Sequence, residues 1–359
     1  MNRKESMEKH RSQGGKVLAV FPGRYPRAAC EAAGFLPVEV WDPPGDLSDA
    51  GAHLPAFVCS VAQRGLGYFL DGKLQVDALL FPHICDTLQN MFSIVRDCVA
   101  AEKSTLMFYP PRGDSSPAME QYLAGKVEAL SEQLAQVAGC DKPDGDALRT
   151  ALDEQVKAQQ ALGHLYLRRK AGALGSSNRE FYDMVRLAEY LPALDFAAAA
   201  NDFLQNQTGA AFRPDAPKIV LSGVLPQREL IDALDNAGCL VVEDDLLSAG
   251  RRVLRKLPEL PEDPWLAMAR LLLALPPCTT VGASLDARGE FLESLASSGA
   301  QGVVFHTVKF CEPELFDHPV LLKRLAKIGM PTLVLESELY PSSDGPMVTR
   351  LEAFLEMVS

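Results

Sequence analysis

The chain has 359 residues and contains no C-x-x-C pair, no G-x-G-x-x-G fingerprint and no G-x-x-x-x-G-K-S/T loop. The first absence argues against a zinc ribbon and against a thioredoxin-type redox site. The other two argue against a nucleotide site within this chain. No apolar run approaches the roughly 20 residues that a membrane-spanning helix needs, so no membrane segment is expected.

The chain also has too little positive charge for a nucleic-acid partner. It carries 35 Lys and Arg against 47 Asp and Glu, a net charge of −12, whereas a phosphate backbone requires a basic face. Residues 1–15 are polar and lack the apolar stretch of a secretory signal, so we expect a flexible tail. Eight cysteines without an export signal indicate a reducing cytoplasm and free thiols.

A strand–helix–glycine–strand pattern occurs twice along the chain. Residues 16–22 and 35–42 form its first copy, with Gly34 ending the helix between the strands; residues 218–223 and 239–245 form its second, with Gly238 in the same place. A glycine that ends the helix between two short strands is typical of βαβ units. The sequence therefore predicts two Rossmann-like or flavodoxin-like α/β domains with parallel sheets, joined by a helical segment.

The composition sets the expected domain boundaries. Strand signals vanish from about residue 115 to residue 206, where Ala, Leu, Gln, Glu and Lys recur at helical spacing. We expect a flexible tail at 1–15, an N-terminal α/β domain at 16–114, a helical segment at 115–210 and a C-terminal α/β domain at 211–359.

Three cysteines, Cys59, Cys85 and Cys311, each follow a predicted hydrophobic strand. These strands cover residues 53–59, 77–85 and 302–311. The carboxyl edge of a parallel sheet is where ligands bind, and Cys85 and Cys311 hold matching places in the two copies. The pattern predicts that the three thiols share a metal site.

The residues alone leave the nature of that site open. Each cysteine could instead be a small buried apolar residue, a common fate of free cysteine. Zinc would need a fourth ligand, which His83 or His306 could supply, whereas a [4Fe–4S] cluster accepts three thiolates and leaves one iron open. Both histidines could also be core residues hydrogen-bonded to the backbone.

Several charged groups have two interpretations as well. The basic clusters 168–170 and 251–252 could contact a pyrophosphate or form solvated helix faces. Asp244 and Asp245 follow a predicted strand, where they could support metal ligands or cap a helix.

Several segments of the sequence resemble those of subunits of the 2-hydroxyacyl-CoA dehydratase and benzoyl-CoA reductase family. The matching segments are 32–38, 81–86, 238–245 with Gly250 and Arg251, 308–313, 331–336 and 349–356, in family order across nearly the whole chain. One departure stands near the start. The family's Pro-Glu-Glu-Leu is replaced by Pro26-Arg-Ala-Ala29.

The resemblance implies two α/β domains joined by helices and a [4Fe–4S] cluster bound by Cys59, Cys85 and Cys311. It implies pairing with a paralogous second subunit, or a homodimer, and a separate ATP-dependent iron–sulfur activase that delivers one electron. The implied activity is that of a cytoplasmic lyase, which eliminates water from a 2-hydroxyacyl-CoA through a ketyl radical.

Two alternatives share the same cysteines. One is a subunit of ATP-dependent benzoyl-CoA (aroyl-CoA) reductase, an oxidoreductase; the other is an electron-relay subunit whose cluster does not contact substrate. A structural zinc site is a further possibility. His83, His306 and Lys309 lie near the ligand cysteines in sequence and are the candidate catalytic residues.

Overall fold

The computed structural model describes residues 1–47, 50–113, 115–281, 283–340 and 345–358. It contains two four-stranded sheets with strand orders β2-β1-β3-β4 and β6-β5-β7-β8, and every paired strand is parallel. The strands are β1 Lys16–Val20, β2 Phe35–Glu39, β3 Ala78–Pro82, β4 Ser104–Phe108, β5 Lys218–Gly223, β6 Leu240–Leu246, β7 Gly302–Val308 and β8 Thr332–Ser337. The predicted α/β fold with two parallel sheets is confirmed, and the identical strand order reflects the repeat in the sequence.

In each sheet, the first strand in the sequence lies between the two strands that follow it, so the connections leave it in opposite directions. β1 pairs with β2 on one side and β3 on the other, and β5 stands between β6 and β7 in the same way. Strands β3 and β7 are buried along their whole length, as expected for parallel strands covered on both faces. The carboxyl ends of β1 and β3, and of β5 and β7, therefore border the crevices where such sheets bind ligands.

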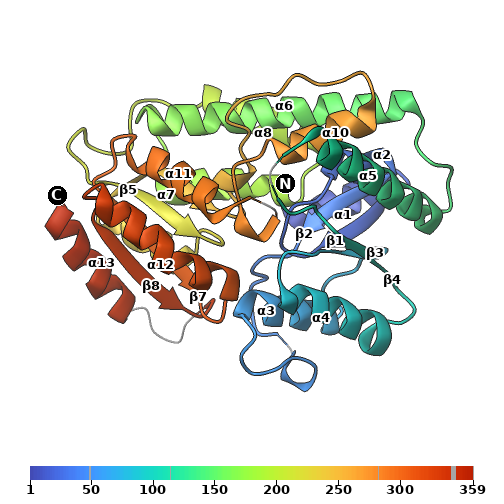
Figure 1. The fold of residues 1–359 in the computed structure, drawn as a ribbon, viewed down its shortest axis with the longest axis horizontal. Coiled ribbons are helices and arrows are strands. Elements are labelled where there is room, and N and C mark those ends of the chain that lie inside the picture. Colours follow the sequence, from blue (N-terminus) through green and yellow to red (C-terminus); the bar gives the residue numbers. More distant parts are fainter. Residues whose placement is uncertain (48–49, 114, 282, 341–344, 359) are drawn as a thin grey trace.

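Helices cover both sheets and connect them (Figure 1). They are α1 Arg3–Ser12, α2 Arg27–Ala32, α3 Ser60–Leu70, α4 Asp86–Ile94, α5 Pro117–Ala138, α6 Gly145–Lys170, α7 Asn178–Arg186, α8 Ala193–Gln205, α9 Arg228–Asn236, α10 Pro264–Leu273, α11 Leu285–Ala296, α12 Glu312–Lys327 and α13 Gly345–Val358. A π-helical turn, Val95–Val99, follows α4. None of the helices in the described residues combines the length and hydropathy of a transmembrane segment.

Helix α10 lies away from its sequence neighbours. It packs against α5 and α6, and Figure 1 shows it in orange beside the much earlier α5. Its Met268 joins a core that contains Cys30 of α2 and Leu123 of α5. The second half of the sequence therefore completes the core of the first sheet, while the expected domain boundaries stay predictions.

The expectation of a flexible tail at residues 1–15 is wrong. Helix α1 begins with a capping box in which Asn2 and Glu5 satisfy each other's backbone N–H groups. Arg3 forms an ion pair with Glu189 at 3.2 Å, and the Ser6 hydroxyl donates to the Tyr190 carbonyl at 2.7 Å. These contacts dock the N-terminus onto the segment after α7.

The predicted strand at 53–59 is also wrong. The segment forms turns in which the amides of His53 and Leu54 donate to the Ala50 carbonyl, so these donors are not available to a sheet. Pro55 has no N–H to offer. Phe57 is 70% exposed.

Candidate functional site

Cys59, Cys85 and Cys311 line one cavity, which is partly open to solvent. Each of them is the residue at which a helix begins: Cys59 precedes α3, Cys85 precedes α4 and Cys311 precedes α12. The turns after β3 and β7 deliver the last two to equivalent places in the two halves. The structure thus brings together the three thiols that the sequence singled out.

The cavity lies where the two halves of the chain meet. Its walls come from the carboxyl ends of strands in both sheets, with Pro22 after β1 and Val224 after β5. The Leu339 amide after β8 donates to the Ser60 hydroxyl at 2.9 Å. Because α3 and α4 belong to the first half and α12 to the second, a group bound by all three cysteines would join the two halves.

Opposing electrostatic effects act on the three thiols. Helix N-termini favour negative charge, and backbone N–H groups of the first turns lower the pKa of each cysteine. Burial outweighs them: it raises the pKa of Cys59, raises that of Cys85 to about 11 and raises that of Cys311 well above its ordinary value. The charges of neighbouring cysteines raise the pKa of Cys85 and Cys311 further. Three thiolates therefore require a bound cation.

The described donors do not form the ligand set of a single metal ion. Within the described residues, no three side chains of His, Cys, Asp or Glu are placed to hold one metal ion. No histidine is among the described residues that line the cavity, so the Cys3His alternative lacks its fourth ligand there. A [4Fe–4S] cluster accepts three thiolates and needs no fourth ligand from the chain.

The turn before Cys311 is strained. Phe310 has φ of +63°, in the left-handed region that residues other than glycine rarely adopt. Its side chain lines the cavity. Such strain costs on the order of 1 kcal/mol and concentrates at functional sites. The sequence carried no signal of it.

A buried ion network supports the first turn of α12. Glu314 lines the cavity and accepts from Arg251 at 2.9 Å and from Arg288 at 2.6 Å. Both arginines also bind Asp245, and Arg288 binds Asp317. Burial alone would raise the pKa of Glu314, but the two arginines outweigh it and hold that pKa well below its ordinary value. The network fixes a carboxylate one turn beyond Cys311.

The aspartates and arginines for which the sequence left two interpretations open make contacts within the fold. Asp244 and Asp245 lie within β6, and the Asp244 carboxylate accepts from the Gly250 amide at the start of a short 3-10 helix, Gly250–Arg252, at 2.7 Å. Tyr166 and Tyr182 donate to Asp244, and burial raises its pKa to about 6. Arg169 is buried and donates to the carbonyls of Val241 and Ser176, whereas Arg168 and Lys170 of the same cluster are exposed.

The three candidate catalytic residues lie outside the lining of the cavity. His83 bonds to Gln89 at 2.6 Å. His306 is wholly buried in β7, where Nε2 meets the Ser337 hydroxyl at 2.9 Å and burial lowers its pKa to about 4. Lys309 is half exposed, 3.9 Å from Glu338. Their catalytic roles stay predictions that the geometry does not favour.

Comparison with known proteins gives consistent relatives over the whole chain. The beta subunit of lactoyl-CoA dehydratase from Anaerotignum propionicum is 26% identical over 99% of this chain and 96% of that protein. The (R)-phenyllactyl-CoA dehydratase beta subunit of Clostridium sporogenes is 25% identical over 99% and 95%. A benzoyl-CoA reductase subunit of Thauera aromatica is 24% identical over 92% and 87%.

A family model described as 2-hydroxyglutaryl-CoA dehydratase, D-component, matches residues 23–358. The match includes strands β2 to β4 of the first sheet, the whole second sheet and all three cavity cysteines. The chain belongs to the 2-hydroxyglutaryl-CoA dehydratase D-component family.

Proposed function

We propose that the chain is a subunit of an iron–sulfur 2-hydroxyacyl-CoA dehydratase, with Cys59, Cys85 and Cys311 as the ligands of a [4Fe–4S] cluster. The observation that carries the proposal is the convergence of three helix-initiating cysteines on one cavity. The beta subunits of lactoyl-CoA and (R)-phenyllactyl-CoA dehydratases among the relatives support the substrate class.

When bound, the cluster would supply one-electron chemistry and a Lewis-acidic iron not ligated by the chain. The residues of the chain bind and shield it. Backbone N–H groups of α3, α4 and α12 stabilise the thiolates, and apolar residues such as Val224, Leu247 and Val308 keep the cavity dry. The activating electron would come from a separate ATP-dependent activase, since the chain contains no P-loop. We place the reaction in the cytoplasm.

Two related functions use the same site. The likeness to the benzoyl-CoA reductase of Thauera aromatica favours aroyl-CoA reduction as an alternative. An electron-relay role is favoured by the scarcity of proton donors in the cavity. Besides the cysteines, the described residues that line the cavity include two titratable side chains, Glu312 and Glu314. Glu314 is held between two arginines and is not free to donate a proton.

The proposal is tested by anaerobic purification, metal analysis and assay. We expect about four iron and four acid-labile sulfide per chain. We also expect turnover of a 2-hydroxyacyl-CoA or aroyl-CoA thioester only with the partner subunit, an activase, ATP and a low-potential reductant. Zinc without sulfide would contradict the cluster, and aerobic turnover by the chain alone would contradict the activation. A substrate-induced change in the cluster's EPR signal would separate direct substrate contact from electron relay.

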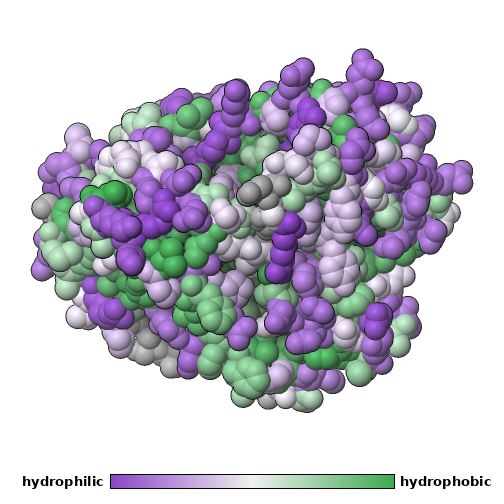
Figure 2. All heavy atoms as spheres, in the orientation of Figure 1, coloured by the Kyte–Doolittle hydropathy of each residue, from purple (hydrophilic) through white to green (hydrophobic). Residues whose placement is uncertain are grey.

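We further propose that a paralogous second subunit, or a second copy of this chain, covers the surface beside the cavity. Large apolar side chains are exposed there: Phe57 is two residues before Cys59, and Leu315 and Phe316 follow Cys311, with Phe316 77% exposed. Figure 2 shows apolar side chains at the surface in the lower part of this face, where Figure 1 places α12. Clustered exposed apolar residues are typical of protein interfaces.

Phe316→Ser is expected to weaken this association, since exposed aromatic anchors carry a large share of interface energy. A loss of about 2 kcal/mol, or roughly 30-fold in affinity, is in the usual range. Sedimentation of the purified complex measures it, with the exposed Tyr122→Ser on α5 as the control. Unchanged assembly of a Phe57→Ser, Phe316→Ser double variant would rule out this surface.

A further inference from the structure

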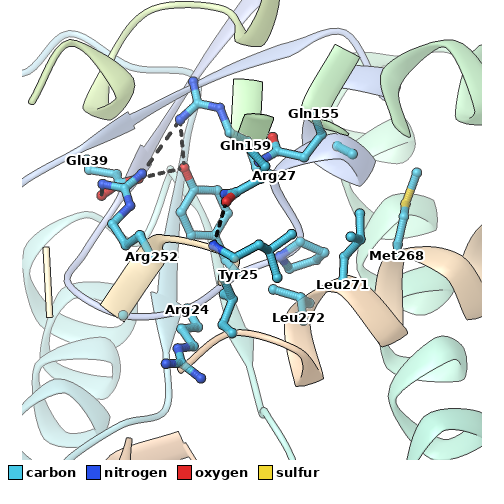
Figure 3. A pocket seen from close by; sticks show the side chains of 15 residues that line it. Arg24, Tyr25, Arg27, Glu39, Gln155, Gln159, Arg252, Met268, Leu271 and Leu272 are labelled. Carbon is cyan, nitrogen blue, oxygen red and sulfur yellow. Dashed lines mark hydrogen bonds and ion pairs between the residues drawn. The ribbon is translucent and has the colours of Figure 1, made fainter. Parts of the chain in front are cut away.

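Two more chambers lie behind the loop after β1, and they share the residues Arg24, Leu272 and Leu275. The first chamber is drawn in Figure 3. The second lies between the segment after β4 and the segment from α10 to α11. Both are open to solvent.

The polar wall of the first chamber is already neutralised by its own contacts. Arg252 binds Glu39 through two hydrogen bonds of 2.9 and 2.8 Å, and the Tyr25 hydroxyl donates to Glu39 at 3.0 Å. Figure 3 shows this group on one side and Met268, Leu271 and Leu272 of α10 on the other. Arg252 and Arg27 in that wall are already paired with carboxylates of the chain, so they are not available to bind an anionic ligand.

Arg24 differs from them. Its guanidinium points away from the Glu39 group in Figure 3, and Nη2 donates to the carbonyls of Arg251, at 3.2 Å, and Pro276. Its Nε–H is buried without a hydrogen-bond partner. No carboxylate in the described part of the chain forms an ion pair with it. A buried donor without a partner is costly, and a bound acceptor would satisfy it.

The surroundings of Arg24 restrict what that ligand can be. Among the described residues that line the second chamber, Arg24 is the one charged side chain, and most of the others are apolar. In the first chamber the Gln155 Oε1 atom is buried without a partner and could accept a hydrogen bond. The chambers therefore offer a cation, an amide and long apolar walls.

We propose that these chambers bind an organic anion, a carboxylate or phosphate ester carried on an apolar body, with its anionic group at the Arg24 guanidinium. Arginine is suited to such groups because its N–H donors match carboxylate and phosphate oxygens. The ligand could be a free carboxylic acid or the phosphate-bearing part of a CoA thioester. The inference goes beyond the proposed cluster function and does not depend on it.

The chambers lie next to the cysteine cavity. Pro22 lines that cavity, whereas its neighbours Gly23 and Arg24 line the chambers. Gly23 has φ of +146°, and a Cβ there would come within 2.7 Å of Pro82 in β3. The loop that carries Arg24 is therefore packed against the strand that leads to Cys85, and an anion at Arg24 would be bound close to the proposed cluster.

Isothermal titration of the full-length, anaerobically purified chain tests the proposal with three probes: 3-phenylpropanoate, CoA and inorganic phosphate. We expect binding of phenylpropanoate, CoA or both, weakened about 10- to 100-fold in Arg24→Gln and partly restored in Arg24→Lys. Leu272→Trp, which fills the shared part of the chambers, is expected to block binding. Arg213→Gln removes an exposed arginine, 80% accessible, and should bind as the wild type does.

Each outcome has a defined meaning. Binding of phenylpropanoate alone identifies a free acid as the ligand, and binding of CoA alone identifies the thioester's phosphates. Failure of all probes to bind the wild type would overturn the proposal, as would equal binding to Arg24→Gln and Leu272→Trp. Phosphate binding as tight as that of the organic probes would overturn the apolar requirement. Iron content is measured in every variant, so that loss of the cluster is not mistaken for loss of the anion site.

Discussion

Cys85→Ser is expected to give a folded chain that retains almost no iron or acid-labile sulfide after anaerobic purification. The same result is expected for Cys59→Ser and Cys311→Ser, because a serine hydroxyl does not replace a thiolate as a ligand of an iron–sulfur cluster. The loss should appear as missing brown absorbance and a several-fold fall in bound iron. Each thiol begins a different helix, so no neighbouring cysteine of the cavity can take its place without moving a helix.

The matched control is Cys98→Ser. Cys98 is exposed in the π-helical turn after α4 and is not part of the cavity, so its replacement should leave iron and sulfide at the wild-type level. Retention of the full cluster in all three cavity variants would remove the basis of the proposed function. Circular dichroism of each variant would show whether it is folded.

Arg251→Met is expected to destabilise the fold by about 3–5 kcal/mol, the range for breaking a buried ion pair from one side. Arg251 is wholly buried, and its removal leaves Asp245 and Glu314 with Arg288 as their remaining partner in the network. Urea unfolding measures the change, and Arg213→Gln at an exposed pair should change stability by less than about 1 kcal/mol. A change below about 1 kcal/mol in Arg251→Met would show that the network does not hold α12 in place.

The pH dependence of this loss has a defined sign. In the wild type, the two arginines hold the pKa of Glu314 below its ordinary 4.5, so its stabilising contribution is complete above about pH 5 and is lost progressively as the pH falls below 4.5. In Arg251→Met, Arg288 alone would oppose the effect of burial, so that pKa would be higher than in the wild type, and protonation at mild acidity would relieve a charge that has lost one of its two partners. The difference in unfolding free energy between the two proteins should therefore shrink from about pH 7 to about pH 5.

The sequence contained enough to predict the sheets and two of the cysteines. Short apolar strands followed by helices that end at glycine are recognisable from the local sequence. Cys85 and Cys311 follow the corresponding strand of this pattern in each half. Cys59 also lines the cavity, but the reason for expecting it there was wrong, since turns and not a strand precede it. The Asn2–Glu5 capping box was readable as a helix start, yet the polar composition suggested a tail.

The ion network could not be predicted in the same way. Glu314 and Arg288 lie on helices among other charged residues, where the usual expectation is a solvated face, and only the folded chain places them against Asp245 and Arg251. Arg24 is a similar case. In the described chain, no carboxylate is paired with Arg24, because the segment that includes α10 packs beside it. Sequence periodicity does not reveal this packing.

The position of α10 also has a consequence for the order of synthesis. The first sheet and the helices α2 and α5 leave the ribosome well before residues 254–275, but their core stays open until those residues arrive. A nascent chain that ends before α10 would therefore expose apolar surface on α2 and α5. Chaperones that bind such surfaces would act on this protein in the interval before translation reaches residue 275.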